Sequence, residues 1–543
     1  MSYINKQIDP NKIPQSQKLN KNQVKNDAGG YVYQIDIWNM LNRFLILGTE
    51  SSGYHVNAAT KFERSNDNID KCLKADGLKT VQIAVNVSHE GRAVKNDQAI
   101  FVLARASMSL ELSVRKAAFE AVPKVCRIGT HLYQFVAFRK YLEGGWGRLM
   151  KDTVSNWFNA KDANKLAYQV AKYKSREDWS ARDLLRKAHT TPRTPEHEAI
   201  FNWVCGVPKL NKEGQTVERL RTFGNEAKLP AFLEACDKIK TTTPKETISL
   251  IKEFNLPREV VPTVMLNDVK VWEALAENMP MTATIRNLGK MTSIGLLTDG
   301  SESVRKLANQ LMNEDAIHKS RVHPLTILSA MAIYGSGCGV KGSLTWSPVR
   351  NILDALEDAF YLSFKNVEPT NKRTMLGLDV SGSMTWRRLL GIHLTPMEVS
   401  AAMAMITVRT EKADCYPMAF SNEFKPLPWS RKSSIRDVVK NMVKIGMGPT
   451  DCAVPMVHAL KNKIPVDTFV IYTDNETWCG AIHPSVALKN YRQKMGIDAK
   501  LIVCATESSG FSIADSKDKD QLDIAGFDSA TPKIISEFSR GNI

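Results

Sequence analysis

Apolar residues recur at helical spacing from Tyr31 to about Phe364. Between a cap at Asn267–Asp268 and a stop at Pro280, apolar side chains fall at positions i, i+3, i+4 and i+7, namely Trp272, Leu275, Ala276 and Met279. Similar patterns predict helices over residues 97–121, 162–174, 180–190, 195–205 and 348–364. Successive helices joined by short polar turns are typical of a helical-repeat solenoid, which we predict for residues 31–367.

The pattern changes near residues 366–372. After this point apolar runs of β type alternate with helical segments, and they predict strands over residues 375–380, 415–420, 468–473 and 500–505. Between the first two strands, Thr395 can cap a helix that starts at Pro396, with Glu398 completing a capping box. Apolar strands that alternate with helices indicate a parallel sheet covered on both faces. We therefore expect an α/β domain over residues 368–543.

Length and composition agree with two large domains. The chain has 543 residues, of which 43% are hydrophobic and 24% charged. No apolar run approaches the ~18 residues of a transmembrane helix, and the N-terminus lacks the apolar core of a signal peptide. Residues 1–30 are polar and are predicted to form a flexible arm. The nine scattered cysteines indicate reduced thiols and a cytoplasmic protein, with nuclear shuttling open if the organism is eukaryotic.

Positive charge is concentrated in the helical part. The formal net charge is +16, and residues 1–370 carry +12 of it. Residues 124–190 alone hold 14 basic and 6 acidic side chains. On the predicted helix over residues 180–190, one face presents Arg182, Arg186 and His189, with Tyr173 and Trp179 nearby. Cations contact phosphates and aromatic rings stack on unpaired bases, so this face suits RNA. The alternative is a solvated face of amphipathic helices.

Oxygen-bearing side chains follow two of the predicted strands. Asp379, Ser381 and Ser383 form a DxSxS loop after the first strand, Thr450 lies in a loop before a helix, and Asp474 ends the strand over residues 468–473. Ligands collect at the carboxyl ends of parallel strands. Hard oxygen ligands favour Mg²⁺, with Mn²⁺ as the alternative. Two acids and three hydroxyls do not supply all the ligands of the metal ion, so water or a carboxylate of a protein partner would complete its coordination shell.

Motifs of catalysis are missing from the sequence. The chain contains no GxxxxGK[ST] phosphate loop, no HExxH zinc motif and no GxSxG nucleophile elbow. We therefore expect a protein without enzymatic activity.

Several segments together resemble the family of Ro ribonucleoprotein autoantigens, the TROVE-domain family. They include RNLGKM (residues 286–291), KRTMLGLDVSGSM (372–384) and TDNETW (473–478), and the similarity runs from about residue 31 to the end. The resemblance implies a ring of HEAT-like helical repeats closed by a Rossmann-like von Willebrand factor A domain. It implies an RNA-binding protein that is a monomer and is not associated with membranes. Y RNAs would bind an outer basic surface, and single-stranded 3′ ends of misfolded noncoding RNAs would enter a central hole. Some bacterial members work with the exonuclease polynucleotide phosphorylase.

The family's functional positions can be carried onto this chain. The Y-RNA surface would comprise Arg127, His131, Arg139, Lys140, Lys172, Lys174, Arg176, Arg186 and His189. The hole would be lined by Arg286, Lys290, Arg321 and His323. In the metal-ion-dependent adhesion site, the direct ligands would be Ser381, Ser383 and Thr450, while Asp379 and Asp474 would act through water.

Two functions therefore remain in competition. The first is an RNA-binding ring that takes part in RNA quality control. The second is a metal-dependent protein-adhesion scaffold that uses its C-terminal domain and has only nonspecific affinity for RNA.

Overall fold

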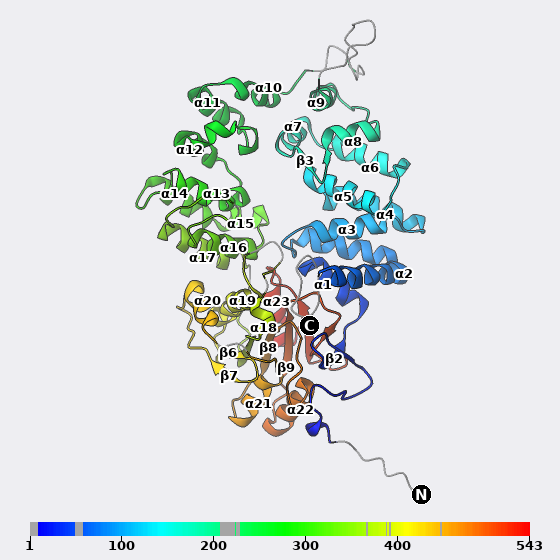
Figure 1. Cartoon of the computed structure of the whole chain (residues 1–543), viewed down its shortest axis with the longest axis vertical. Coiled ribbons are helices and arrows are strands. Elements are labelled where there is room, and N and C mark those ends of the chain that lie inside the picture. Colours follow the sequence, from blue (N-terminus) through cyan, green and yellow to red (C-terminus); the bar gives the residue numbers. More distant parts are fainter. Residues whose placement is uncertain are drawn as a thin grey trace.

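The computed structural model describes residues 9–48, 58–206, 223, 228–340, 342–364, 367–386, 388–389, 393–445 and 448–543. Two arms of helices rise from a C-terminal α/β domain and meet at the far end of the molecule (Figure 1). Among the described residues, no helix combines the length and the apolar character that a membrane span requires.

The first arm runs from α1 to α9. Its helices are α1 (Ile37–Leu47), α2 (Ala58–Glu90), α3 (Asp97–Ala106), α4 (Leu112–Val125), α5 (Gly129–Tyr141), α6 (Arg148–Asn159), α7 (Ala163–Lys172), α8 (Ala181–Ala188) and α9 (Pro195–Cys205). A two-stranded hairpin of β3 (Ser175–Arg176) and β4 (Trp179–Ser180) packs on α5. The predicted helix over 97–121 is in fact two helices, because Ser107 and Ser109 hydrogen-bond to nearby backbone and interrupt the ladder.

The second arm returns towards the C-terminal domain. Its helices are α10 (Ala231–Lys238), α11 (Pro244–Phe254), α12 (Val269–Glu277), α13 (Met281–Ser293), α14 (Glu302–Leu311), α15 (Glu314–Ser320), α16 (Pro324–Gly335) and α17 (Arg350–Leu362), and its 3₁₀ turns are η3 (Ile239–Thr241), η4 (Arg258–Val260) and η5 (Thr263–Asn267). The arms meet where α7 contacts α10 and η4. The predicted cap of α12 is confirmed, since Asp268 accepts hydrogen bonds from the backbone of Lys270 and Val271.

The C-terminal domain is built on a six-stranded sheet in the order β11-β9-β8-β5-β6-β7. The strands are β5 (Thr374–Asp379), β6 (Cys415–Phe420), β7 (Phe424–Pro426), β8 (Thr468–Thr473), β9 (Lys500–Ala505) and β11 (Gln521–Ala525). The four predicted strands are confirmed, and every neighbouring pair is parallel except β6 with the edge strand β7. Strands β7 and β11 were not predicted, because they are short and contain polar residues rather than a continuous apolar run.

Helices cover both faces of this sheet. They are α18 (Gly382–Trp386), α19 (Pro396–Thr410), α20 (Ile435–Val443), α21 (Val454–Lys461), α22 (Pro484–Met495) and α23 (Thr531–Arg540). Leu376 and Leu378 point into the core shared with α19 and α20, while Met375 of the same strand points into a second core with α21 and α22. The predicted capping box of Thr395 and Glu398 starts α19.

The N-terminal segment is not a free arm over its described part. After a 3₁₀ turn, η1 (Pro10–Lys12), the strands β1 (Gln23–Lys25) and β2 (Tyr31–Gln34) form a three-stranded sheet with β10 (Phe511–Ser512) of the C-terminal domain. The prediction of a flexible arm is therefore wrong for residues 9–30, and residues 1–8 lie outside the described ranges. The polar composition misled the prediction, because these side chains bond to a loop far along the chain.

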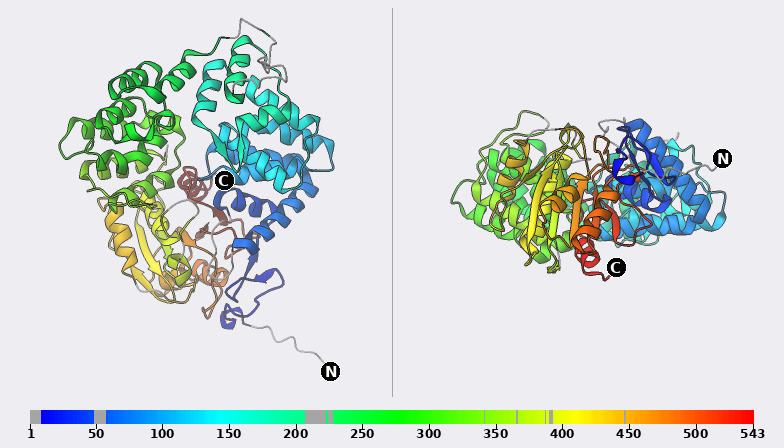
Figure 2. Two further views of the ribbon diagram at one scale, coloured as in Figure 1. Left: turned by 45° about the horizontal axis from the view of Figure 1, so that its top comes forward. Right: turned by 90° about the horizontal axis from the view of Figure 1, so that it is seen from below.

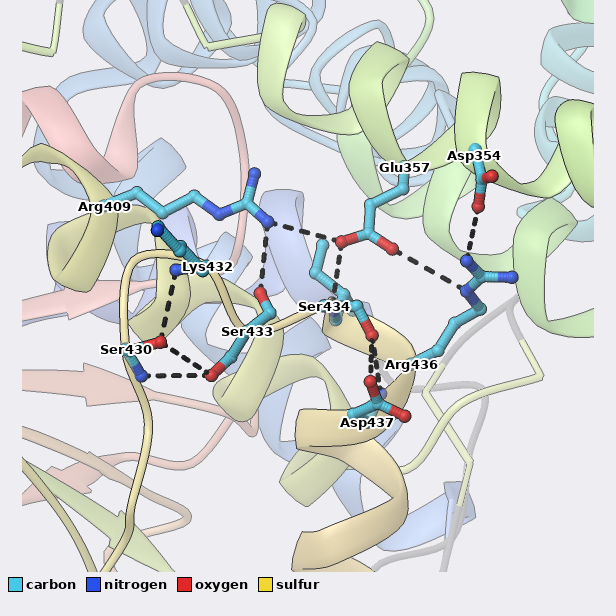
Figure 3. A network of polar contacts seen from close by, with 10 residues as sticks. Asp354, Glu357, Arg409, Ser430, Lys432, Ser433, Ser434, Arg436 and Asp437 are labelled. Carbon is cyan, nitrogen blue, oxygen red and sulfur yellow. Dashed lines mark hydrogen bonds and ion pairs between the residues drawn. The ribbon is translucent and has the colours of Figure 1, made fainter.

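Both ends of the helical part are joined to the C-terminal domain, which closes the ring (Figures 1 and 2). At α1, the buried Arg43 forms an ion pair with Asp523 at 2.6 Å. At α17, Glu357 and Asp354 bind Arg409 of α19 and Arg436 of α20 (Figure 3). The contact at α1 joins residues 480 apart in the chain, and those at α17 join residues 52 to 82 apart.

Candidate functional site

Four basic side chains from the two arms approach one another. Burial lowers the pKa of Arg127, and the charge of Arg321 on the opposite arm lowers it further. Burial, followed by the charges of Arg127 and Arg176, lowers the pKa of His131 to about 4. The charges of Arg127, Arg176 and Arg321 thus act within one group of basic residues that also contains His131, and we call these four residues the arginine cluster.

The arginine cluster is only partly neutralised. Arg176 faces Asp97 at 3.9 Å and Glu177 at 3.4 Å, which is weak pairing for an exposed guanidinium. Arg127 donates to the hydroxyl of Ser88 and to the carbonyl of Lys124, both at 3.1 Å and both neutral. The sequence analysis assigned Arg127 and Arg176 to the outer surface and Arg321 to the hole. The fold instead brings residues of both sets together.

A cavity of about 640 Å³, the central cavity, lies between the arms and the C-terminal domain. Its polar and aromatic lining includes Lys95, Arg258, Arg286, Asn287, Lys290, Trp346 and His393. Arg286 and Lys290, which were assigned to the hole, both line this cavity, and Lys290 donates to Asn267 at 2.9 Å. Lys95, Arg258, Trp346 and His393 were not predicted, since they come from separate loops and carry no local motif.

The glycine of the RNLGKM motif has a structural reason. A Cβ atom at Gly289 would lie 2.6 Å from the ring of Trp346. Glycine in the middle of α13 costs conformational entropy, but here it permits the indole to lie against the helix. Trp346 in turn stacks on Tyr334, with ring centroids 6.1 Å apart. The motif therefore shapes the wall of the central cavity.

The remaining predicted RNA contacts lie in different places. Lys172 lines a pocket of about 300 Å³ at the junction of the arms, beside Arg258 and Glu259. Lys140, Lys174 and His189 are exposed on the first arm, and Arg186 is half-buried on α8. The capping box of Ser180 and Asp183 that starts α8 was correctly predicted.

Two residues predicted to contact RNA, Arg139 on the outer surface and His323 in the hole, are buried. Arg139 is 6% exposed and donates to the Ser107 hydroxyl and to the carbonyl of Gly145. His323 is also 6% exposed, accepts from the backbone of Leu325 at 3.1 Å and donates to the carbonyl of Arg92 at 3.2 Å. Burial lowers the pKa of His323, so it stays neutral and links the two arms. Neither side chain is exposed, which the predicted RNA contacts would require.

The five predicted metal ligands converge at the carboxyl edge of the sheet. Strands β5 and β8 are parallel neighbours, so Asp379 at the end of β5 lies next to Asp474, which directly follows β8. The hydroxyls of Ser381 and Ser383 are 3.2 Å apart, and the carbonyl of Thr450 accepts a hydrogen bond from the backbone of Trp478 in the loop after Asp474. All five side chains are buried.

The chemistry of this group fits a cation. One oxygen of Asp474, Oδ2, is buried without a hydrogen-bond partner. Burial raises the pKa of Asp379, and the charge of Asp474 raises it further. Hydrogen bonds from Ser381 and Thr473 lower the pKa of Asp379, and no positive charge of the described residues is among the causes that act on it. A divalent ion would remove the repulsion and satisfy the free oxygen.

The N-terminal segment braces this site. Gln15 is fully buried, and its amide donates to Asp451 and to the carbonyl of Ile482, each at 2.7 Å. Asn26 donates to the carbonyl of Thr477 at 2.8 Å. A Cβ atom at Gly30 would lie 1.9 Å from that same oxygen, so only glycine fits. The loops that carry Thr450 and Asp474 are thus held from outside, by residues that had no predicted role.

Comparisons with known proteins agree with this architecture. A model of the TROVE domain matches residues 24–333, and a model of the Ro60 vWA domain matches residues 373–539. An RNA-binding protein RO60 of Deinococcus radiodurans is 38% identical over 548 residues, covering 100% of both chains. An RNA-binding protein RO60 of Caenorhabditis elegans is 36% identical over 597 residues, covering 97% of this chain and 92% of the relative.

A solved structure supports the same relationship. The crystal structure of the Deinococcus radiodurans RO (RSR) protein matches with a TM-score of 0.68 at 37% sequence identity, over 94% of this chain and 100% of that one. The predicted fold class, a helical-repeat ring with a von Willebrand factor A domain, is confirmed. The chain belongs to the Ro60 family of TROVE-domain proteins.

Proposed function

We propose that this protein binds RNA and takes part in quality control of noncoding RNA. The proposal rests on two observations: the arginine cluster, where cations from both arms act on one another, and the central cavity, which is lined by Lys95, Arg258, Arg286 and Lys290. The names of the two relatives, RNA-binding protein RO60, support it.

Single-stranded 3′ ends are the proposed ligand of the ring interior. Phosphates would pair with the arginine cluster, and an unpaired base would stack on Trp346 in the central cavity. A strand without secondary structure enters a narrow passage more readily than an A-form duplex does. The ring would thereby select RNAs with a free end, as misfolded transcripts have.

Y RNAs are the proposed ligand of the outer surface. The exposed Lys174 and His189 and the half-buried Arg186 lie on the first arm near the exposed Lys140. Duplex RNA would be held there through its phosphates, with little sequence readout. A Y RNA in this position would limit access to the ring and regulate binding of other RNAs.

The metal site completes the proposal. Mg²⁺, or Mn²⁺ in its place, would be held by Asp379, Ser381, Ser383, Thr450 and Asp474. When bound, the ion supplies an electrophilic contact for a carboxylate of a protein partner. That partner, or an exonuclease such as polynucleotide phosphorylase recruited by the complex, would act on the RNA, and the chain itself would have no enzymatic role.

Binding of three labelled RNAs tests the function: a blunt duplex, a duplex with a single-stranded 3′ tail, and the tail alone. We expect the tailed duplex to bind most tightly. In the double variant Arg127→Gln/Arg321→Gln, the slope of the logarithm of the binding constant against the logarithm of the salt concentration should fall by the equivalent of about two phosphate contacts. The control Lys461→Gln/Lys489→Gln makes the same change of net charge on exposed residues of α21 and α22. Equal affinities that fall together with salt, and equal losses in both double variants, would favour the adhesion scaffold.

A further inference from the structure

A second basic pocket lies on the first arm, apart from the arginine cluster and the central cavity. It has a volume of about 410 Å³ and is formed by the end of α5, the loop before α6, and α8. We call it the indole pocket, and its main side chains are Arg139, Lys140, Trp146, Trp179 and Lys187. Glu143 is the one acid among its lining residues.

The pocket holds a buried positive charge without a counter-ion. Every hydrogen-bond acceptor of Arg139 is neutral: the carbonyl and hydroxyl of Ser107 and the carbonyl of Gly145. Its Nε is buried without a partner, and no carboxylate of the described ranges pairs with it. A buried guanidinium without an acid is costly. An anion bound in the pocket would offset that cost.

Two indoles and two lysines line the same pocket as Arg139. The rings of Trp146 and Trp179 have centroids 5.9 Å apart and are tilted by 41°. The ammonium of Lys187 lies 5.9 Å from the Trp146 ring, and that of Lys140 lies 6.0 Å from the Trp179 ring. Trp179 is buried, whereas Trp146 is partly exposed. No atom lies within 4 Å of a Cβ built at Gly145, so the neighbouring backbone is open.

We propose that the indole pocket binds one unpaired nucleotide of RNA, with the base against Trp146 and the phosphate between Lys140 and Lys187. The pairing of an aromatic face with adjacent cations is the arrangement that single-stranded nucleic acids use. The proposal rests on RNA binding as the function. It assigns Lys187 and Trp146, for which the sequence analysis had no role. A free nucleotide has the same chemistry, so the experiment must distinguish the two sources.

The test measures affinity for a uridine hexamer, for uridine monophosphate and for a blunt duplex. It uses the full chain in the Arg127→Gln/Arg321→Gln background, which weakens binding by the ring interior. We expect Trp146→Leu and Lys187→Gln each to weaken hexamer binding about tenfold, Trp146→Phe to retain most of it, and duplex binding to stay unchanged. The control is Lys79→Gln, because Lys79 lies 4.1 Å from the ring of Trp38 in a similar pair on α1 and α2. Thermal melting of each variant shows that it is folded.

Each result decides between the possibilities. Equal hexamer affinities in folded Trp146→Leu, Lys187→Gln and Lys79→Gln overturn the indole pocket and leave RNA binding intact. Uridine monophosphate that binds as tightly as the hexamer, with the same losses, overturns the assignment to RNA in favour of a free nucleotide. A wild-type protein that binds none of the three RNAs of the previous section overturns the function together with the pocket.

Discussion

Closure of the ring at α17 depends on one buried carboxylate, and we predict that Glu357→Gln opens it. The Glu357 side chain is 9% exposed, contacts Arg409 at 3.4 Å and Arg436 at 3.7 Å, and accepts from the backbone of Ile435 at 2.9 Å (Figure 3). The substitution keeps the shape and removes the charge. The new amide oxygen could still accept from Arg409, but Arg409 would lose its charged partner and, among the described residues, keep the carbonyl of Ser433 and the ring of Tyr361 as further contacts.

The expected loss follows from the burial of the partners. Removing one member of a buried ion pair costs about 3–5 kcal/mol. Arg409 is 30% exposed and Arg436 keeps Asp354 at 2.5 Å, so we expect about 2–3 kcal/mol here. The control is Asp354→Asn on the same helix. Asp354 is 48% exposed, so its loss should be below about 1 kcal/mol.

Hydrogen exchange measures this opening locally, which suits a protein with two domains. Amides of α17 and α20 that exchange through the opening should exchange roughly 30- to 150-fold faster in Glu357→Gln, since about 1.4 kcal/mol corresponds to a factor of ten. The effect should persist in 0.5 M salt, whereas that of Asp354→Asn should disappear. Exchange in Glu357→Gln no faster than in Asp354→Asn would refute the role of the buried charge.

Three further predictions follow from the described contacts. Gln15→Ala should lower the free energy of unfolding by about 1–3 kcal/mol, because it leaves the carbonyl of Ile482 without its buried donor and leaves Asp451 Oδ1 with the backbone amide of Ala453 in place of two donors. Gln17→Ala, at an exposed position, should change the free energy of unfolding by less than about 0.5 kcal/mol in urea denaturation. The pKa of His131 is lowered from 6.5 to about 4 in the folded protein, so as pH falls from 6.5 towards 4 the unfolded chain binds a proton at His131 that the folded chain does not. Between pH 7.5 and pH 5 the wild type should therefore lose about 2 kcal/mol more stability than His131→Gln. Identical losses in the two proteins would contradict the lowered pKa of His131. Mn²⁺ should raise the melting temperature of the wild type but not that of Asp474→Asn. Without metal, Asp474→Asn should be more stable than the wild type, because the substitution removes the repulsion between residue 474 and Asp379. An equal rise in melting temperature with Mn²⁺ in both proteins would exclude this site.

Local patterns were reliable where the physics is local. The caps at Asp268, Ser180 and Thr395 were read from the sequence because a capping side chain bonds to backbone only a few residues away. The four central strands were found because strands buried on both faces are continuously apolar. The gathering of the five oxygen-bearing side chains follows from strand order in a parallel sheet.

Long-range partners could not be read in the same way. Residues 9–30 have the composition of a flexible segment, yet Gln15 and Asn26 bond to a loop more than 400 residues away. Arg139 and His323 stood in basic stretches typical of a surface, and tertiary packing buried both. Lys187 lay in the same basic stretch as Arg186, and only the fold places it beside Trp146.

The sequence by itself determined the two-domain plan, the helical and α/β character of each part, the convergence of five oxygen-bearing side chains at the sheet edge and the location of the basic excess. These follow from periodicity, capping and composition, which act over short stretches of chain. The tertiary structure alone decided which cations face one another, how the ring closes through Arg43 and Glu357, and that the N-terminal segment braces the metal-site loops. Such contacts join residues that are distant in the chain, and their energies depend on burial and geometry that exist only after folding.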